Sequence, residues 1–232
     1  MGFKEYERNM SFLDLELSKT LGSSRTQKFL KEIHDYVRWE PIDRILMDVY
    51  PVGKAAVGNS AYPPVMLLKA LLLQKWFGIR SDPELENQIN DRISFKVFIG
   101  LPFGDPSPDH SVISRFRDRV GAKAMERIHA ELLAQLQVKG YSIDAGLAVD
   151  ARLVRSASSP LSKDKLEKIN QQRQQEKKDG KDKPVKFSRD VESDWTVKNG
   201  DPVYGMKEHA SIDVRSGLVL TTVLSRASEH DT

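Results

Sequence analysis

The sequence contains no cysteine and no long uncharged apolar run. Without cysteine there is no disulfide framework, no thiolate metal site and no cysteine nucleophile, so any metal must be held by carboxylates, imidazoles or other oxygen groups. A membrane-spanning helix needs roughly 18 to 20 consecutive apolar residues, whereas Lys69 already interrupts the most apolar run, residues 65–73. The beginning of the chain also lacks the apolar stretch of a secretory signal. These absences predict a cytoplasmic protein without a membrane partner.

A large excess of charge of either sign is also missing. The chain has 36 Lys and Arg residues against 33 Asp and Glu residues, a net charge of +3. Hydrophobic residues make up 39% and charged residues 30% of its 232 residues, which is enough for a packed core beneath a highly charged surface. This balance permits binding to a polyanion but does not require it.

Residues 1–140 show the periodicity of helices. Apolar residues recur at helical intervals from residue 27 to residue 50, and Pro41 is expected to divide this run into two amphipathic helices. Pro63 and Pro64 suit the first turn of a helix that is apolar almost all round as far as Phe77. We expect this helix to be the buried centre of a helical domain.

Two further helices are predicted by their capping residues. Ser81 and Glu84 fit a capping box, and they open a helix whose apolar stripe is Leu85, Ile89, Ile93 and Val97. After a loop at residues 100–108, Asp109 can cap a second helix. Its inward residues are expected to be Val112, Ile113, Phe116 and Val120. A last helix, at residues 122–138, closes this half of the chain.

The pattern changes after Gly140, where we place a domain boundary. Residues 146–154 are rich in branched apolar side chains, which predicts a buried strand with Asp150 in its middle. Residues 161–200 contain 19 charged residues, 11 basic and 8 acidic, and we expect them to form a flexible, solvated insertion. Residues 203–213 alternate in polarity, and residues 218–225 follow as the second arm of a hairpin.

A carboxylate in a buried strand must be paired, hydrogen-bonded or bound to a metal to offset its desolvation. One interpretation is that Asp150 is a structural acid, satisfied by the backbone or by Arg152 or Arg155. The other is that Asp150 is a metal ligand on the first strand of a catalytic sheet. The residues themselves leave both interpretations open.

Two long stretches of the sequence resemble a known family. They are GLAVDARLVRSASSP at residues 146–160 and YGMKEHASIDVRSGLVLTTVLSRASEHD at residues 204–231, and they resemble the DDE transposases of bacterial insertion sequences, specifically the IS-five group. In the N-terminal half, residues 59–101 and PDHSVISRFRDRV at residues 108–120 resemble the helical domain of the same proteins. The resemblance therefore spans nearly the whole chain in unbroken order.

The resemblance implies an α+β protein with two domains. Residues 1–140 would be the helical DNA-binding domain, and residues 141–232 the first three strands of a ribonuclease H-like α/β catalytic domain, with the charged insertion at 161–200. The family's first catalytic carboxylate, a metal ligand in a Val-Asp-Ala motif, corresponds to Asp150. Its second Asp, in Asp-x-Gly-Tyr, and its Glu, in Tyr-x-x-Arg-x-x-x-Glu, have no counterpart, since Asp144 is followed by Ala-Gly-Leu and precedes the strand.

We therefore expect a truncated transposase that binds DNA but is inactive alone. Complete relatives would use Mg2+ or Mn2+, and phosphodiester displacement with two metal ions needs several carboxylates to hold them. Asp150 by itself would bind such an ion weakly or not at all. The alternatives are a DNA-binding regulator of transposition derived from a transposase fragment, or one half of a frameshifted active transposase.

Other acids could replace the missing ones, but each has a plainer interpretation. Asp213 precedes a turn and is expected to bond to the turn amides. Asp231 is expected to cap a helix. Lys207 and His209 project from one side of their strand, where they could face phosphate or the metal site, or simply water.

Candidate DNA-binding residues lie on the helix after Asp109. They are Ser111, Arg115, Arg119 and Lys123, which form a polar row suited to phosphate contacts and base edges. An ordinary solvated helix face is the alternative. The resemblance favours binding to the terminal inverted repeats in double-stranded DNA, with nucleoid association and with a second copy or a full-length transposase as partner.

Overall fold

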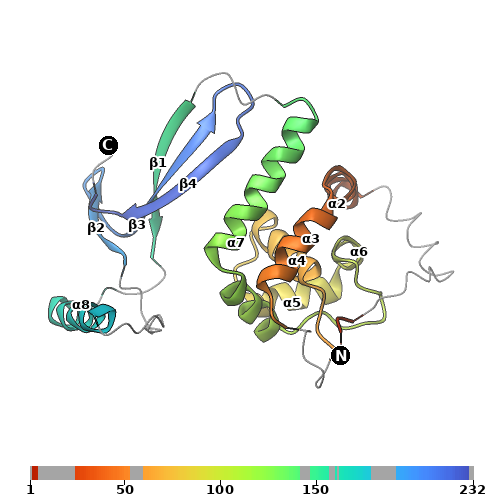
Figure 1. The fold of residues 1–232 in the computed structure, drawn as a ribbon, viewed down its shortest axis with the longest axis horizontal. Helices are drawn as coiled ribbons and strands as arrows, with labels where there is room; N and C mark the ends of the chain where they lie inside the picture. Colours follow the sequence, from red (N-terminus) through yellow and green to blue (C-terminus); the bar gives the residue numbers. More distant parts are fainter. Residues whose placement is uncertain are drawn as a thin grey trace. The chain divides into compact units, whose positions relative to one another are not determined.

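The computed structural model shows an α+β protein of two compact units, Met1–Lys139 and Gly140–Thr232. The structure describes residues 2–4, 24–52, 60–141, 147–156, 160, 162–178 and 192–229. The first unit is helical and the second contains an antiparallel sheet (Figure 1). Each unit is considered by itself.

The first unit contains six described helices. They are α2 (Arg25–Tyr36), α3 (Trp39–Val49), α4 (Pro64–Trp76), α5 (Asp82–Asp91), α6 (Ile93–Ile99) and α7 (His110–Val138). Helix α4 begins with Pro64 in its first turn and is buried around most of its circumference, as predicted. Met66, Ala70 and Leu73 belong to the core shared with α2, α5 and α6. Leu67 and Leu68 face the core shared with α3 and α7, so α4 is apolar on both sides because it lies between two clusters.

Helix α4 contains one buried charged residue, Lys69, whose side chain lies against an aromatic ring. Lys69 is 6% exposed, and its ammonium lies 4.4 Å from the centre of the Trp39 ring and 3.2 Å from His34 Nδ1. Contact with the ring face offsets part of the cost of burying a cation. Lys69 can therefore occupy a buried position without ending the helix.

Two predicted helix boundaries are wrong. The break between the first two helices lies at Val37 and Arg38, while Pro41 is in the first turn of α3, where its missing N–H costs no helical hydrogen bond. The helix opened by Ser81 ends at Asp91, because Arg92 is extended, with φ −103° and ψ 110°. The break shifts the helical phase, so α6 buries Phe95, Phe98 and Ile99, while Val97 is 43% exposed.

The predicted helices at residues 110–120 and 122–138 form one bent element, α7. Its two segments meet at Gly121, which has φ 67° and ψ 175°, a conformation that a side chain would strain. Ile113, Phe116 and Val120 are buried before the bend, and Ala124 is buried after it. The inward face predicted for the first segment is thus confirmed for Ile113, Phe116 and Val120, whereas Val112 is only half-buried.

The described part of the second unit contains a four-stranded antiparallel sheet and one helix. Its elements are β1 (Leu147–Arg155), α8 (Lys163–Lys178), β2 (Asp194–Lys198), β3 (Asp201–Asp213) and β4 (Val219–Arg226). Strand β3 pairs with β1 along one edge and with β2 and then β4 along the other. The predicted hairpin is confirmed as β3 and β4. Two predictions are corrected: the described sheet has four strands and not three, and the segment taken as a flexible insertion includes α8 and β2.

On β3, Gly205 lies close to the backbone of β1. A Cβ atom added there would lie 2.1 Å from the Val154 carbonyl oxygen. The predicted burial of β1 is wrong, since Ala148, Val149 and Asp150 are exposed. Among the described strands β1 pairs with β3 alone, and Val149 is 65% exposed.

Candidate nucleic-acid interface

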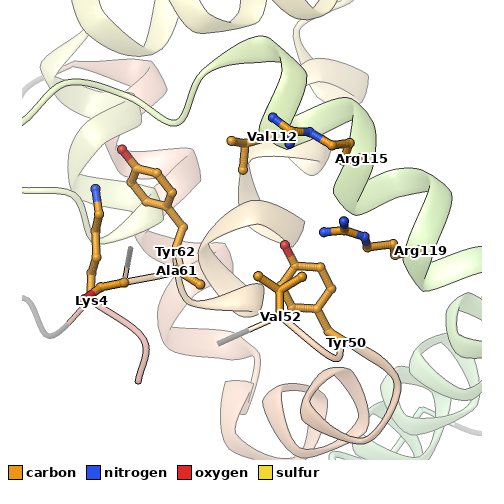
Figure 2. Close-up of a pocket in the computed structure, with 9 residues that line it drawn as sticks. Lys4, Tyr50, Val52, Ala61, Tyr62, Val112, Arg115 and Arg119 are labelled. Atoms are coloured by element: carbon orange, nitrogen blue, oxygen red, sulfur yellow. The ribbon is translucent and has the colours of Figure 1, made fainter. Parts of the chain in front are cut away.

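A hollow of about 620 Å³ lies on the helical unit beside the first segment of α7 (Figure 2). We call it the basic hollow, because three cationic side chains border it. Its lining consists of Lys4, Tyr50, Val52, Ser60, Ala61, Tyr62, Val112, Arg115 and Arg119. These residues come from the N-terminal segment, the end of α3, the approach to α4, and α7.

The start of α7 holds Arg115 in place. Asp109 caps the helix by accepting a 2.7 Å hydrogen bond from the Ser111 N–H, as predicted. Arg115 donates through Nε to the Ser111 carbonyl oxygen at 2.9 Å and through Nη2 to Ser111 Oγ at 2.6 Å. These two hydrogen bonds to Ser111 therefore fix the orientation of the Arg115 side chain. Arg119 lies one helical turn further on, and its guanidinium points into the hollow (Figure 2).

The opposite wall is built by the N-terminal segment and the approach to α4. Phe3 forms an isolated bridge with Ala61, and the Lys4 N–H donates to the Ala61 carbonyl oxygen at 2.7 Å. The Lys4 ammonium lies 3.9 Å from the centre of the Tyr62 ring. These contacts add a third cation to the hollow from a segment far from α7 in the sequence.

Among the described residues, the cations at the basic hollow form no ion pairs, although the charge of Arg115 interacts with the nearby Asp109 carboxylate. These cations are Lys4, Arg115 and Arg119. Arg117, on another side of α7, shows the contrast: its Nη2 lies 2.6 Å from Asp82 Oδ1 and 3.0 Å from Gln74 Oε1. The Arg117 guanidinium keeps the pKa of Asp82 below its usual value. Arg117 thus joins α7 to α5, whereas Arg115 and Arg119 remain available to an anion.

Three side chains that could bind a metal ion lie close together at the N-terminus of α7. They already form hydrogen bonds at the first turn of this helix. Ligand atoms of Glu86, Asp109 and His110 lie within 4.8 Å of one another. Glu86 accepts from both the N–H and Nδ1 of His110, at 2.9 and 2.8 Å, and this hydrogen bond, with the nearby Asp109, raises the pKa of His110. The positive end of the helix dipole also opposes a cation here. The arrangement joins α5 to the start of α7.

The four residues predicted to bind DNA do not all lie on one continuous surface. Ser111, Arg115 and Arg119 lie on the first segment of α7, and both arginines line the basic hollow. Lys123 is exposed, but it follows the bend at Gly121 and is not among the lining residues. No periodic pattern marks Lys4, Tyr50 and Tyr62, which reach the hollow from other segments.

Asp150, Lys207 and His209 do not share one face of the sheet. Asp150 is exposed and pairs with Ala210, while Ala151 pairs with His209 and Leu153 with Lys207. Because neighbouring residues of a strand point to opposite faces, Lys207 and His209 project from the face opposite to Asp150. Lys207 donates to the Glu229 carbonyl oxygen, and His209 Nε2 lies 3.0 Å from Ser225 Oγ.

On the face of the sheet that carries Asp150, the neighbouring side chains form an ion pair. Arg152 and Glu208 are opposite each other across β1 and β3, and they form a salt bridge. Within the described ranges, no group of three acidic or histidine side chains suited to a metal includes Asp150. These residues therefore do not fit a pair of divalent ions.

Asp213 takes the structural role predicted for it. It is fully buried and accepts hydrogen bonds from the N–H and Oγ of Ser216, at 2.7 and 2.6 Å. These bonds hold the turn between β3 and β4. Asp144 and Asp231 lie outside the residues that the structure describes.

Residues 19–119 match a family model described as Transposase domain (DUF772). The matched range includes helices α2 to α6 and ends in the first segment of α7, at Arg119. No solved structure matches the chain significantly. Among the described helices, none combines the length and the apolar character needed to cross a membrane. The match supports a transposase-related function, with DNA as the partner that this function suggests.

Proposed function

We propose that this transposase-related chain binds double-stranded DNA through the basic hollow of its helical unit. Arg115 and Arg119 contact backbone phosphates, and Ser111 keeps Arg115 oriented toward them. The DNA sequence bound is that of the terminal inverted repeats, as the resemblance to the IS-five group implies. Lys123 extends the contact beyond the bend in α7.

One observation carries this proposal: Arg115 and Arg119 lie together at a hollow with Lys4, and none of the three forms an ion pair within the described ranges. Guanidinium groups bind phosphate oxygens in a forked geometry, and the strength of such charge-assisted bonds exceeds that of neutral ones. The same residues lie in or beside the part of the chain matched by the transposase-domain model. The alternative, an ordinary solvated helix face, does not require three cationic side chains to meet at one hollow.

The test is an equilibrium binding assay with the full chain and a duplex carrying the element's end. Arg115→Ala combined with Arg119→Ala is expected to weaken binding by roughly 10- to 100-fold, since two charge-assisted bonds are lost. The matched control is Arg25→Ala with Lys28→Ala, which removes the same charge from exposed positions on α2. Equal affinity of the double variant and the wild type would contradict the proposal, as would an equal loss in the control.

We further propose that Asp150 is the counterpart of the first catalytic carboxylate, without a metal pair around it in this chain. Its exposed position beside the Arg152 and Glu208 ion pair offers one free carboxylate, whereas in-line displacement with two metal ions requires a cluster. The chain is accordingly proposed to hold DNA without cutting it. Mg2+ or Mn2+ would bind here weakly at most.

A further inference from the structure

We infer that the basic hollow encloses one unpaired nucleotide of the bound DNA, with its phosphate at Arg119 and the Tyr50 hydroxyl and its base against the apolar wall. This inference rests on the proposed function and deepens it. It assigns the hollow a ligand that a fully paired duplex does not present.

The first observation is a tyrosine hydroxyl at the hollow that has no hydrogen-bond partner among the described residues. Tyr50 is 2% exposed, and its ring is fixed edge-on against Phe116, with the centroids 5.3 Å apart. Its hydroxyl forms no hydrogen bond with any residue that the structure describes, and it points into the hollow beside the Arg119 guanidinium (Figure 2). A phosphate oxygen at this point would accept from both Tyr50 and Arg119.

The second observation is the size of the hollow. Its volume of about 620 Å³ is within the range of roughly 300 to 1,000 Å³ that is typical of sites enclosing small molecules. A phosphate that passes along a protein surface in a duplex needs only a shallow contact. The space beside Arg115 and Arg119 therefore accommodates more of a nucleotide than its phosphate.

The third observation is the chemistry of the wall. Val52, Ala61, Tyr62 and Val112 provide apolar surface in the same hollow as the guanidinium groups. Proteins that take a base out of the stack enclose it between aromatic and apolar side chains. Lys4 already lies over the Tyr62 ring, which leaves the remaining wall to the base. A base can reach this wall only when it is not held in a base pair.

The experiment compares the full chain's affinities for two duplexes of one sequence, one fully paired and one with a single unpaired nucleotide. We expect the second duplex to bind about tenfold more tightly, as is typical of contacts to one unstacked base. Tyr50→Phe keeps the ring against Phe116 and removes only the hydroxyl, and it is expected to lower the ratio of the two affinities several-fold, because one hydrogen bond to the phosphate of the unpaired nucleotide is lost. Tyr141→Phe, at an exposed position, is the matched control and should keep the wild-type ratio.

The outcomes separate this inference from the proposed function. If neither duplex binds, the proposed function fails and the inference fails with it. If both bind equally, or if Tyr50→Phe keeps the wild-type ratio, the inference is overturned while DNA binding stands. Free deoxyadenosine monophosphate should abolish the preference for the unpaired duplex at concentrations where inorganic phosphate does not. Equal competition by inorganic phosphate would overturn the role assigned to the apolar wall.

Discussion

Asp150 and His209 lie on opposite faces of one sheet. Asp150 is opposite Ala210 across β1 and β3, whereas His209 is opposite Ala151. A polar pocket that combines the acid with His209 and Lys207 is therefore not formed, although all three residues are only a few positions apart in register. The carboxylate nearest in register on the face of Asp150 is Glu208, and Glu208 is paired with Arg152.

The first prediction concerns catalysis. The purified chain, supplied with Mg2+ or Mn2+, is expected to leave supercoiled DNA intact, because one exposed carboxylate does not position two metal ions. The measurement is the conversion of supercoiled to nicked plasmid over time. Nicking by the wild type that is lost in Asp150→Asn would contradict this prediction and would place Asp150 in an active site.

The second prediction concerns the link between α5 and α7. Arg117→Ala should lower the free energy of unfolding by about 1 kcal/mol at neutral pH, since Arg117 bonds to both oxygens of the mostly buried Asp82 and is itself half exposed. The pKa of Asp82 is lowered in the folded state, so this contribution is complete above the ordinary value of 3.8 and is lost as the pH falls through the lowered pKa. Denaturant unfolding at neutral and acid pH measures both effects. A difference from the wild type that persists at low pH would contradict this account.

The third prediction concerns His110. Its pKa is raised above 6.5 by the hydrogen bond to Glu86 and by the charge of Asp109. The stabilisation is therefore complete below the unfolded-state pKa and is lost as the pH rises through the raised folded-state pKa. An NMR titration of His110 should show the higher value in the wild type and a fall toward the ordinary value in Glu86→Gln. A midpoint that Glu86→Gln leaves unchanged would exclude this pairing.

The fourth prediction concerns Gly205. Gly205→Ala should destabilise the second unit by roughly 1 to 3 kcal/mol, because the new methyl group would meet the Val154 carbonyl oxygen and push β1 away from β3. Circular dichroism during denaturant unfolding measures the loss. Gly217→Ala provides a contrast, since its strain arises from φ 70° and no atom lies within 4 Å of the added carbon. Wild-type stability of Gly205→Ala would show that the strands can separate there without cost.

Much of the helical unit could be predicted because its signals are local. Pro63 and Pro64 opened α4, Asp109 capped α7, and the apolar stripe of the latter was confirmed by the burial of Ile113 and Phe116. The break between α5 and α6 at Arg92 could not be predicted from local signals. The stripe from Leu85 to Val97 fits one continuous helix, and only packing against the core selects Phe95 and Phe98 for burial.

Strand β2 was missed although its signal is local. Asn199 and Gly200 have φ of 54° and 89°, and an Asn-Gly pair between two strands is typical of a tight hairpin turn. The charged composition of the surrounding segment concealed this pair. Composition describes a whole segment, whereas a turn depends on two residues.

The candidate site was predicted in its α7 part and missed elsewhere. Arg115 and Arg119 could be found because they lie one turn apart on one helix. Lys4, Tyr50 and Tyr62 come from segments that meet only in the folded unit, so no spacing in the sequence connects them to α7. The exposure of Asp150 was also missed, because a run of branched apolar residues does not distinguish an edge strand from a buried one.

The most direct test of the central claim, that Arg115 and Arg119 contact DNA phosphates, is the salt dependence of binding. The logarithm of the full chain's binding constant should fall linearly with the logarithm of salt concentration. For Arg115→Ala with Arg119→Ala the slope should be shallower by about 2, since each phosphate contact contributes close to one unit. The control with Arg25→Ala and Lys28→Ala should keep the wild-type slope. An identical slope in the wild type and the Arg115 and Arg119 variant would contradict the claim.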